Sequence, residues 1–175
     1  MRFIETPIPG AMIIELEPHF DERGFFARAW CRNEFQAHGL NYEIVQCNVA
    51  FSRKRGILRG MHFQIDPYAE CKLVRCTAGS VYDVILDLRP HSPTRHKWFG
   101  IELTAGNRRM IYVPEGFAHG YQALEDNSEV FYQMTQFYNK EASRGVRWND
   151  PAFGIKWPID NPILSEQDKN FRLIE

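Results

Sequence analysis

Two histidines lie in or beside segments of the sequence that are typical of β-strands. His62 shares an apolar segment with Arg59, His119 closes the turn that begins at Pro114, and Lys72 begins a further apolar segment. A polar side chain inside a sheet must be hydrogen-bonded, or it destabilises the fold by about 1–3 kcal/mol. For any one such residue a solvent-facing position is the commoner case. Their recurrence points instead to a site inside a barrel.

These residue types suit the movement of a proton beside a carbonyl group. An imidazole titrates near neutral pH, so His62 could remove a proton from a carbon next to a ketone. Lys72 or Arg59 could stabilise the enolate oxygen, and loss of one such donor typically slows a reaction about 10²–10³-fold. The phenol of Tyr132 could return a proton to the opposite face. This set of residues fits an epimerase. A barrel that binds or senses a sugar without catalysis is the alternative.

The sequence lacks the common nucleotide-loop and metal-binding motifs. The sequence contains no Gly-x-Gly-x-x-Gly after a strand, no P-loop and no His-Glu-x-x-His. Pro114-x-Gly-x-x-His119 resembles the second conserved block of cupin barrels. Metal-binding cupins usually also need His-x-His and a downstream Glu, whereas the first block here is His62-Phe-Gln64. We therefore expect a cupin barrel with no metal and no cofactor, in which Gln64 forms a hydrogen-bonding wall.

The elements that must position these residues predict an all-β fold. Aromatic residues make up 14% of the chain, and Pro and Gly interrupt short β-branched segments. Roughly nine to eleven short strands would form one cupin-type jelly-roll barrel over residues 1–175. Strands are expected at 42–51, 72–76, 81–88, 98–103, 110–113 and 129–138, with further ones near the N-terminus and around residue 60. A few short helices would flank the barrel, at 33–38 between Asn33 as cap and Gly39 as stop, and at 164–170 with Ser165 as cap.

Charge and cysteine content limit the partners and the compartment. The formal net charge is −1, which gives no electrostatic case for binding nucleic acid or an anionic membrane, although an anionic small molecule is allowed. The four cysteines form no Cys-x-x-Cys pair, and no apolar segment resembles a signal peptide or approaches a membrane span. We expect reduced thiols in a cytoplasmic protein.

Nine segments between about residue 3 and residue 170 resemble, in order and spacing, the dTDP-4-dehydrorhamnose 3,5-epimerase family. The resemblance therefore covers nearly the whole chain. The segments are Phe20-Asp-Glu-Arg-Gly-Phe-Phe, Gln46-x-Asn48, Leu58-Arg-Gly-Met-His62-Phe-Gln64, Lys72-Leu-Val-Arg-Cys, Gly79-Ser-Val-Tyr-Asp-Val, Asp87-Leu-Arg, Ser92-Pro-Thr, Pro114-Glu-Gly-Phe-Ala-His119-Gly and Leu164-Ser-Glu-Gln-Asp168.

This resemblance implies a cofactor-free jelly roll that forms a homodimer and acts on a nucleoside-diphosphate-linked 4-keto-6-deoxyhexose of the dTDP-rhamnose type. His62 would be the base that removes the proton next to the C4 ketone, and Asp168 would orient it. Lys72 would stabilise the enolate, with His119 in the same network, and Tyr132 would donate the proton from the other face.

The resemblance also implies how the nucleotide is bound. Arg59 would meet the diphosphate together with Gln46 and Asn48, since a guanidinium binds phosphate oxygens in pairs. Arg23 would approach the nucleotide from the neighbouring subunit's N-terminal region, and Phe26 and Arg28 complete the expected substrate-binding set.

Three residues depart from the family pattern. Arg28 stands where the family usually has Glu, and a guanidinium cannot accept the N3 proton of thymine. A CDP- or GDP-linked sugar is therefore an alternative substrate. Ala50 stands where a hydroxyl is common, and Glu70 stands where the family tends to have Gln. These two changes could narrow the reaction to C3 or C5 alone, or suit a different sugar.

Three rival functions remain at this point. They are a metal-dependent cupin enzyme, a non-catalytic sugar-nucleotide binder and a 3,4-ketoisomerase on the same barrel.

Overall fold

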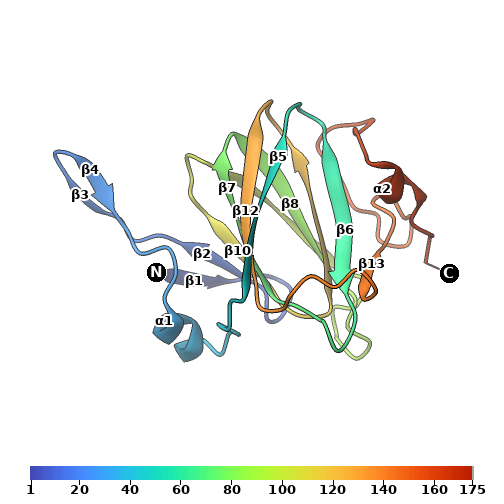
Figure 1. Ribbon diagram of the computed structural model, residues 1–175, viewed down its shortest axis with the longest axis horizontal. Coiled ribbons are helices and arrows are strands. Elements are labelled where there is room, and N and C mark those ends of the chain that lie inside the picture. Colours follow the sequence, from blue (N-terminus) through green and yellow to red (C-terminus); the bar gives the residue numbers. More distant parts are fainter. Residues whose placement is uncertain (175) are drawn as a thin grey trace.

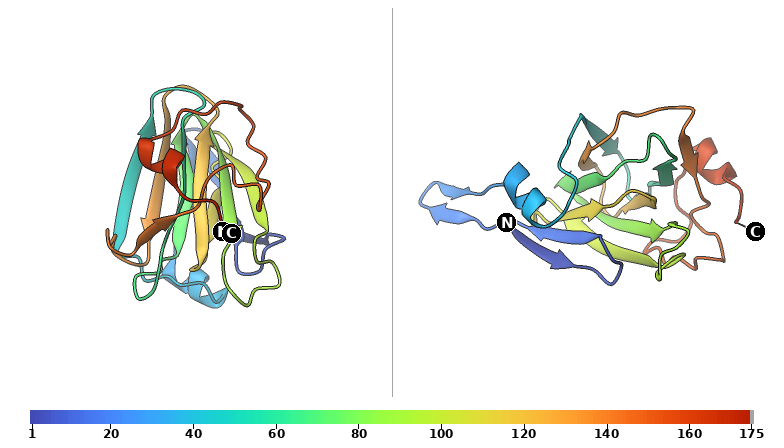
Figure 2. Two further views of the ribbon diagram at one scale, coloured as in Figure 1. Left: turned by 90° about the vertical axis from the view of Figure 1, so that its right-hand side faces the viewer. Right: turned by 90° about the horizontal axis from the view of Figure 1, so that it is seen from below.

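The computed structural model describes residues 1–174 as two antiparallel β-sheets that face each other, with two short helices at the periphery (Figure 1). One sheet has six strands in the order β1-β2-β10-β7-β12-β5, and the other has five in the order β13-β6-β11-β8-β9. A two-stranded hairpin, β3-β4, extends away from both sheets as an arm (Figure 2, right). The predicted domain, 1–175, ends at Glu175, which lies outside the described residues.

The described elements have the following bounds. The six-stranded sheet contains β1 (Arg2–Glu5), β2 (Met12–Glu15), β5 (Gln46–Ser52), β7 (Lys72–Ala78), β10 (Met110–Val113) and β12 (Ser128–Met134). The five-stranded sheet contains β6 (Leu58–Gln64), β8 (Ser80–Asp87), β9 (Trp98–Thr104), β11 (Phe117–Ala123) and β13 (Ser143–Gly145). The arm is β3 (His19–Asp21) and β4 (Gly24–Phe26), and the helices are α1 (Arg32–Ala37) and α2 (Glu166–Asn170).

The period-2 pattern of a strand sends the side chains of β7 to two separate cores. Val74 and Cys76 point between the two sheets, where they pack with residues of β8 such as Ile85. Leu73 points to the outer face, which Phe35 of helix α1 covers. Full burial of an aliphatic side chain stabilises the fold by about 1.5–3 kcal/mol, so both faces of this strand hold the barrel together.

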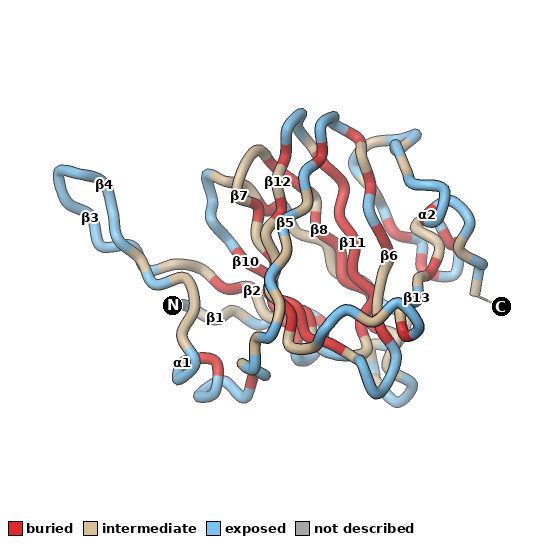
Figure 3. The backbone as a smooth tube through the Cα atoms, viewed as in Figure 1, coloured by how far each residue is buried: buried red, intermediate tan, exposed pale blue. Residues whose placement is uncertain are grey.

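A third layer covers the outer face of the five-stranded sheet. Val146, Phe153 and Ile155, from the segment after β13, pack against Met61 and Ala118 on that face. Strand β11 is consequently buried along its whole length (Figure 3). The same C-terminal segment brings helix α2 beside β6 (Figure 1), so an element late in the sequence lies next to an early strand.

Some predicted boundaries were wrong. Among the described residues the two sheets contain eleven strands, within the predicted nine to eleven, and the arm adds β3 and β4, which have only three residues each and are too short to show a period. Residues 42–45 and 135–138 lie outside the strands to which they had been assigned.

The helix ends were predicted with mixed success. Asn33 is not the cap of α1: Cys31 occupies that position and makes no side-chain cap bond. Gly39 follows the helix with φ of 68°, which fits its predicted role as a stop. Ser165 caps α2, as predicted. Within residues 1–174, neither helix has the length and apolar sequence needed to traverse a bilayer, and all four cysteines are free.

Candidate active site

A cavity of about 730 Å³ lies between the two sheets and takes side chains from both of them and from α2. Eight of the eleven site residues predicted from the sequence line it. They are Gln46, Asn48, Arg59, His62, Lys72, His119, Tyr132 and Asp168. The cavity therefore brings together residues that are up to 122 positions apart in the chain (168 − 46).

A β-bulge lets two residues of β6 face this cavity together. His62 pairs with His119 and Arg59 pairs with Tyr121, so three steps along β6 correspond to two steps along β11. Residues three apart on a regular strand point to opposite faces, and one extra residue cancels that alternation. Both Arg59 and His62 consequently line the cavity.

Two glycines permit the bulge. Gly60 has φ of 140°, a conformation that residues with a Cβ atom rarely adopt. A Cβ atom on Gly60 would also collide with the backbone of Gly120 on β11. The close approach of these two strands thus requires glycine, and it directs the side chains of His62 and Arg59 into the same cavity.

His62 forms a hydrogen-bonded pair with Asp168, as predicted. Its Nε2 atom lies 2.6 Å from Oδ1 of Asp168, and the two side chains are 42% and 5% exposed. The backbone N–H of Asp168 donates to Oγ of Ser165 at 3.1 Å, so the helix cap fixes the position of the carboxylate. The imidazole is therefore open to the cavity while its carboxylate is shielded from water.

Phe171 anchors the segment that carries Asp168. Its ring lies edge-on to the His62 ring with centroids 5.8 Å apart. It also occupies the space where a side chain of Gly145 would be, and Gly145 is the β13 partner of His62 in the sheet. A glycine at this position allows the C-terminal segment to pack tightly beside β6.

His119 belongs to a second imidazole–carboxylate pair. Its Nε2 atom lies 2.9 Å from Oδ2 of Asp83 on β8, and the two side chains are only 9% and 0% exposed. Sequence reasoning missed Asp83. The signal was a lone acid at the centre of the apolar segment 81–88, since a charge is rarely buried without a partner.

Lys72 is held by a buried ion pair with Glu70. Nζ lies 2.7 Å from Oε1 of Glu70, and it also donates to the backbone carbonyl of His62 at 3.5 Å. Glu70 lines the cavity as well, although the sequence had indicated it only as a departure from the family pattern. These contacts place an ammonium group beside the strand that carries the imidazole.

Tyr132 faces the cavity from the sheet opposite His62. It lies on β12 between Asn48 of β5 and Val74 of β7. Burial raises the pKa of the Tyr132 phenol, while the amide of Asn48 acts in the opposite direction. The phenol is therefore protonated at neutral pH and can donate its proton.

Polar groups lie along one edge of the cavity. Gln46 and Asn48 are on the same face of β5, and the Gln46 amide donates to Oδ1 of Asn48 at 3.3 Å. Arg59 donates to the carbonyl of Phe51 at 2.9 Å and is otherwise exposed. A planar guanidinium with free N–H groups at a cavity mouth is suited to bind phosphate oxygens.

Three predicted nucleotide-binding residues do not line the cavity of their own chain. Arg23 forms an ion pair with Asp21 at the tip of the arm, and the Phe26 ring is exposed. Arg28 donates to Glu34 at 2.7 Å, outside the cavity. These residues lie on or beside the β3-β4 arm, which points away from the barrel (Figure 1).

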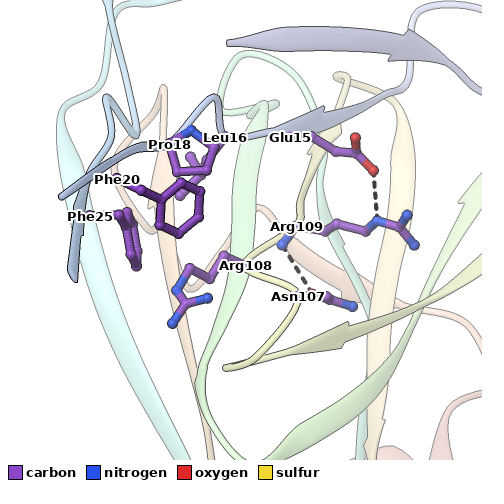
Figure 4. Close-up of a pocket in the computed structure, with 8 residues that line it drawn as sticks. All are labelled: Glu15, Leu16, Pro18, Phe20, Phe25, Asn107, Arg108 and Arg109. Atoms are coloured by element: carbon purple, nitrogen blue, oxygen red, sulfur yellow. Dashed lines mark hydrogen bonds and ion pairs between the residues drawn. The ribbon is translucent and has the colours of Figure 1, made fainter. Parts of the chain in front are cut away.

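The base of the arm is held against the turn before β10. The guanidinium of Arg108 lies 4.7 Å from the centre of the Phe25 ring, and Arg109 donates to Glu15 at 2.8 Å (Figure 4). A cation–π contact of this kind contributes about 0.5–1 kcal/mol at an exposed site. These contacts fix the direction in which the arm leaves the barrel.

Residues 1–174 contain no group of three or more His, Cys, Asp or Glu side chains placed to hold a metal ion. The ionisable groups that face the cavity are imidazole, ammonium, phenol, carboxylate and guanidinium. This set can remove a proton, stabilise a negative oxygen and return a proton.

Comparisons with known proteins agree on one family. The family model for dTDP-4-dehydrorhamnose 3,5-epimerase matches residues 5–175. A dTDP-4-dehydrorhamnose 3,5-epimerase from Shigella flexneri is 46% identical over 171 residues, which are 97% of this chain and 94% of that protein.

Solved structures give the same result. A dTDP-4-dehydrorhamnose 3,5-epimerase from Elizabethkingia anophelis superposes with a TM-score of 0.96 at 41% identity, covering 99% of this chain and 96% of the other. The dTDP-6-deoxy-D-glucose-3,5-epimerase of Legionella pneumophila, solved in complex with dTDP-4-keto-L-rhamnose, has a TM-score of 0.92 at 35% identity over 98% of this chain and 92% of its own. The predicted jelly-roll fold is thereby confirmed.

Proposed function

The chain belongs to the dTDP-4-dehydrorhamnose 3,5-epimerase family of isomerases, and on this premise we propose that it inverts C3 and C5 of a dTDP-linked 4-keto-6-deoxyhexose. The family prediction made from the nine sequence segments was correct. The relative from Legionella, whose solved complex contains dTDP-4-keto-L-rhamnose, supports this class of substrate.

One observation carries the proposed chemistry: the base and the acid lie on opposite walls of the same cavity. His62 comes from the five-stranded sheet and Tyr132 from the six-stranded sheet that faces it. A sugar ring between the two sheets would present one face to the imidazole and the other to the phenol. Removal of a proton from one face and its return to the other inverts the carbon.

Each inversion proceeds through an enolate. His62 takes the proton from a carbon next to the C4 ketone, and the electrons of that C–H bond form a C=C bond while the carbonyl electrons move to oxygen. The ammonium of Lys72 stabilises that oxygen. The C=C electrons then take the O–H proton of Tyr132 from the other face, the C=O bond re-forms, and proton exchange with water restores the phenol and the neutral imidazole. Asp168 holds the imidazole and stabilises its protonated form.

The same steps apply at both reacting centres, because C3 and C5 each neighbour the C4 ketone. Every residue in this scheme has a side chain that lines the cavity. His119, with Asp83, keeps the wall beside His62 in place.

The diphosphate is assigned to the edge formed by Arg59, Gln46 and Asn48. A 4-keto sugar between His62 and Tyr132 would extend its diphosphate toward this edge of the cavity. The guanidinium of Arg59 supplies paired donors for phosphate oxygens.

A homodimer is the assembly that would complete the nucleotide site. Arg23, Phe26 and Arg28 can meet a nucleotide only in another subunit, since they lie outside the cavity of their own chain. Apolar side chains of β5 are exposed on the outer face of the sheet, among them Val49 and Phe51. Burial of such a face and of the arm against a second copy would be favourable. The single unit 1–175 and the cytoplasmic location stay predictions.

The nucleobase of the substrate is a separate question. Arg28 is paired with Glu34, so its guanidinium is partly occupied, and the CDP- and GDP-linked alternatives stay predictions. Turnover of matched dTDP-, CDP- and GDP-linked 4-keto sugars would decide between them, and we expect dTDP to be preferred.

Deuterium incorporation tests the reaction itself. The protein is incubated with dTDP-4-keto-6-deoxyglucose in heavy water, and deuterium at C3 and C5 is followed by NMR. We expect incorporation at both carbons together with inversion of both. Incorporation at one carbon would support the alternative of a single-centre epimerase, and its absence at both would refute the epimerase proposal.

A further inference from the structure

Glu70 is a buried acid that faces the cavity without a complete set of partners. It lies two residues before β7 and lines the same cavity as Lys72. Its side chain is 3% exposed, and it lines the cavity. Charged side chains with so little exposure are rare unless they are fully paired.

The two oxygens of Glu70 differ in their contacts. Oε1 accepts a hydrogen bond from the Lys72 ammonium at 2.7 Å. Oε2 is buried and has no hydrogen-bond partner among the described residues. A buried carboxylate oxygen without a donor costs about 1–3 kcal/mol or more. A donor that arrives with the substrate would remove this cost.

Gln64, another polar residue of the cavity wall, is engaged elsewhere. The amide of Gln64 donates to the carbonyls of Tyr68 and Phe137 and accepts from the N–H of Asn139. The charge of Glu70 contributes to the raised pKa of the Tyr132 phenol, although burial of the phenol is the larger cause. Glu70 thus lies near both Lys72 and Tyr132, the two groups that would contact the sugar in the proposed function.

We propose that Glu70 determines sugar specificity: Oε2 accepts a hydrogen bond from a hydroxyl on C2 or C3 of the hexose while Oε1 holds Lys72. This inference rests on the proposed function. The chemistry of the substrate narrows the donor, because the diphosphate is repelled by a carboxylate and the ketone oxygen and the C6 methyl group cannot donate. In the hexose ring only the two hydroxyls remain.

Such a bond makes the hydroxyl a requirement for efficient turnover. Hydrogen bonds to charged groups are about twice as strong as neutral ones, and a site built around a substrate hydroxyl rejects the analogue that lacks it. Loss of the bonded hydroxyl is expected to lower kcat/KM by about 10–100-fold. Loss of the other hydroxyl should have a much smaller effect.

The test compares the parent dTDP-4-keto-6-deoxyglucose with its 2-deoxy and 3-deoxy analogues. Exchange at C5 is measured, since all three sugars retain that reacting centre. In Glu70→Gln the amide oxygen can still accept from Lys72, but an N–H donor replaces the acceptor at the second position. The preference for the parent over one analogue should shrink at least about threefold in this variant. Glu115→Gln, an exposed acid beside Cys71, is the matched control and should keep the wild-type preference.

A purely structural role for Glu70 would lower kcat for all three sugars by the same factor and leave the preference unchanged, which would overturn the proposal. Equal turnover of all three sugars by the wild type would overturn it too. Dissociation constants of the same sugars, measured in His62→Ala with and without Glu70→Gln, give the preference without turnover. If the wild type exchanges nothing, the proposed function fails, and these binding ratios still decide the role of Glu70.

Discussion

The cavity contains two imidazole–carboxylate pairs that differ in how the fold builds them. His62 and Asp168 are 106 residues apart and meet because the C-terminal segment folds back over β13. His119 and Asp83 lie on neighbouring strands, β11 and β8, inside one sheet. The first pair has an open imidazole, whereas both members of the second are nearly enclosed by protein.

This difference in exposure suits the first pair to proton transfer and the second pair to a structural role. An imidazole that exchanges a proton with a substrate must be reachable, and its orienting acid must be shielded so that the hydrogen bond stays strong. The His62 pair meets both conditions. The His119 pair is more enclosed, and its position directly across from His62 in the sheet suits it to hold the wall of the cavity.

The largest expected effect comes from removal of the open imidazole. His62→Ala should lower deuterium exchange at C3 and C5 by about 10³-fold, because general-base catalysis typically contributes 10²–10⁴-fold. His119→Ala, assayed in parallel, should lose less activity per folded molecule. Equal losses in the two variants would break the distinction between the pairs.

Asp168→Asn tests how the open pair is oriented. The amide keeps the shape of the carboxylate but loses the charge that stabilises the imidazolium, and loss of such an orienting partner typically costs about 10–100-fold. We expect this decrease in kcat for exchange, with little change in KM. Glu166→Gln, on the exposed side of the same helix, is the matched control and should retain full activity. A loss in Glu166→Gln equal to that in Asp168→Asn would assign the effect to the helix rather than to the acid.

Both members of the open pair, His62 and Asp168, were predicted from the sequence, whereas only His119 of the enclosed pair was. Asp168 was assigned through the family resemblance, since nothing in a local pattern places residue 168 beside residue 62. Asp83 was missed because its partner follows from the strand order β6-β11-β8, which periodicity does not reveal. The all-β class was predictable from alternation and breaker residues.

Other features need the three-dimensional arrangement. The bulge that aims Arg59 and His62 together depends on the contact of Gly60 with Gly120, which are 60 residues apart. The open oxygen of Glu70 is defined by what its neighbours already bind, and no sequence pattern records that. Of the arm residues, Arg23 was assigned to a neighbouring subunit, and that assignment stays a prediction.

The stability of the fold at low pH tests the contribution of Asp87 on β8, the strand that also carries Asp83. Asp87 lies four residues after Asp83 on β8. Although burial acts to raise its pKa, hydrogen bonds from Arg89, Ser92 and Thr94 hold it at about 2. Since an unfolded Asp has a pKa near 3.9, this group stabilises the fold fully above that pH and loses its contribution as the pH falls to about 2. We expect the free energy of unfolding to decrease by about 2 kcal/mol over this interval.

Urea unfolding at several pH values between 5 and 2 measures this contribution. Asp87→Asn should show a smaller slope with pH than the wild type, while exchange activity at neutral pH changes little for the protein that is folded. Parallel slopes in the two proteins would show that Asp87 does not carry the pH dependence.

The smallest expected effect concerns the packing that keeps the open pair aligned. In Gly145→Ala the new methyl group would displace the Phe171 ring, which lies beside His62 and belongs to the segment that carries Asp168. A small misalignment should lower kcat about threefold to fivefold with KM nearly unchanged, because orientation affects the chemical step. Gly106→Ala, in the turn before β10, is the control: its Cβ would make an ordinary contact with Thr104 at 3.5 Å. Wild-type kcat in Gly145→Ala would mean that the His62–Asp168 pair stays aligned without the C-terminal packing, and the contrast with the enclosed His119–Asp83 pair would then rest on exposure alone.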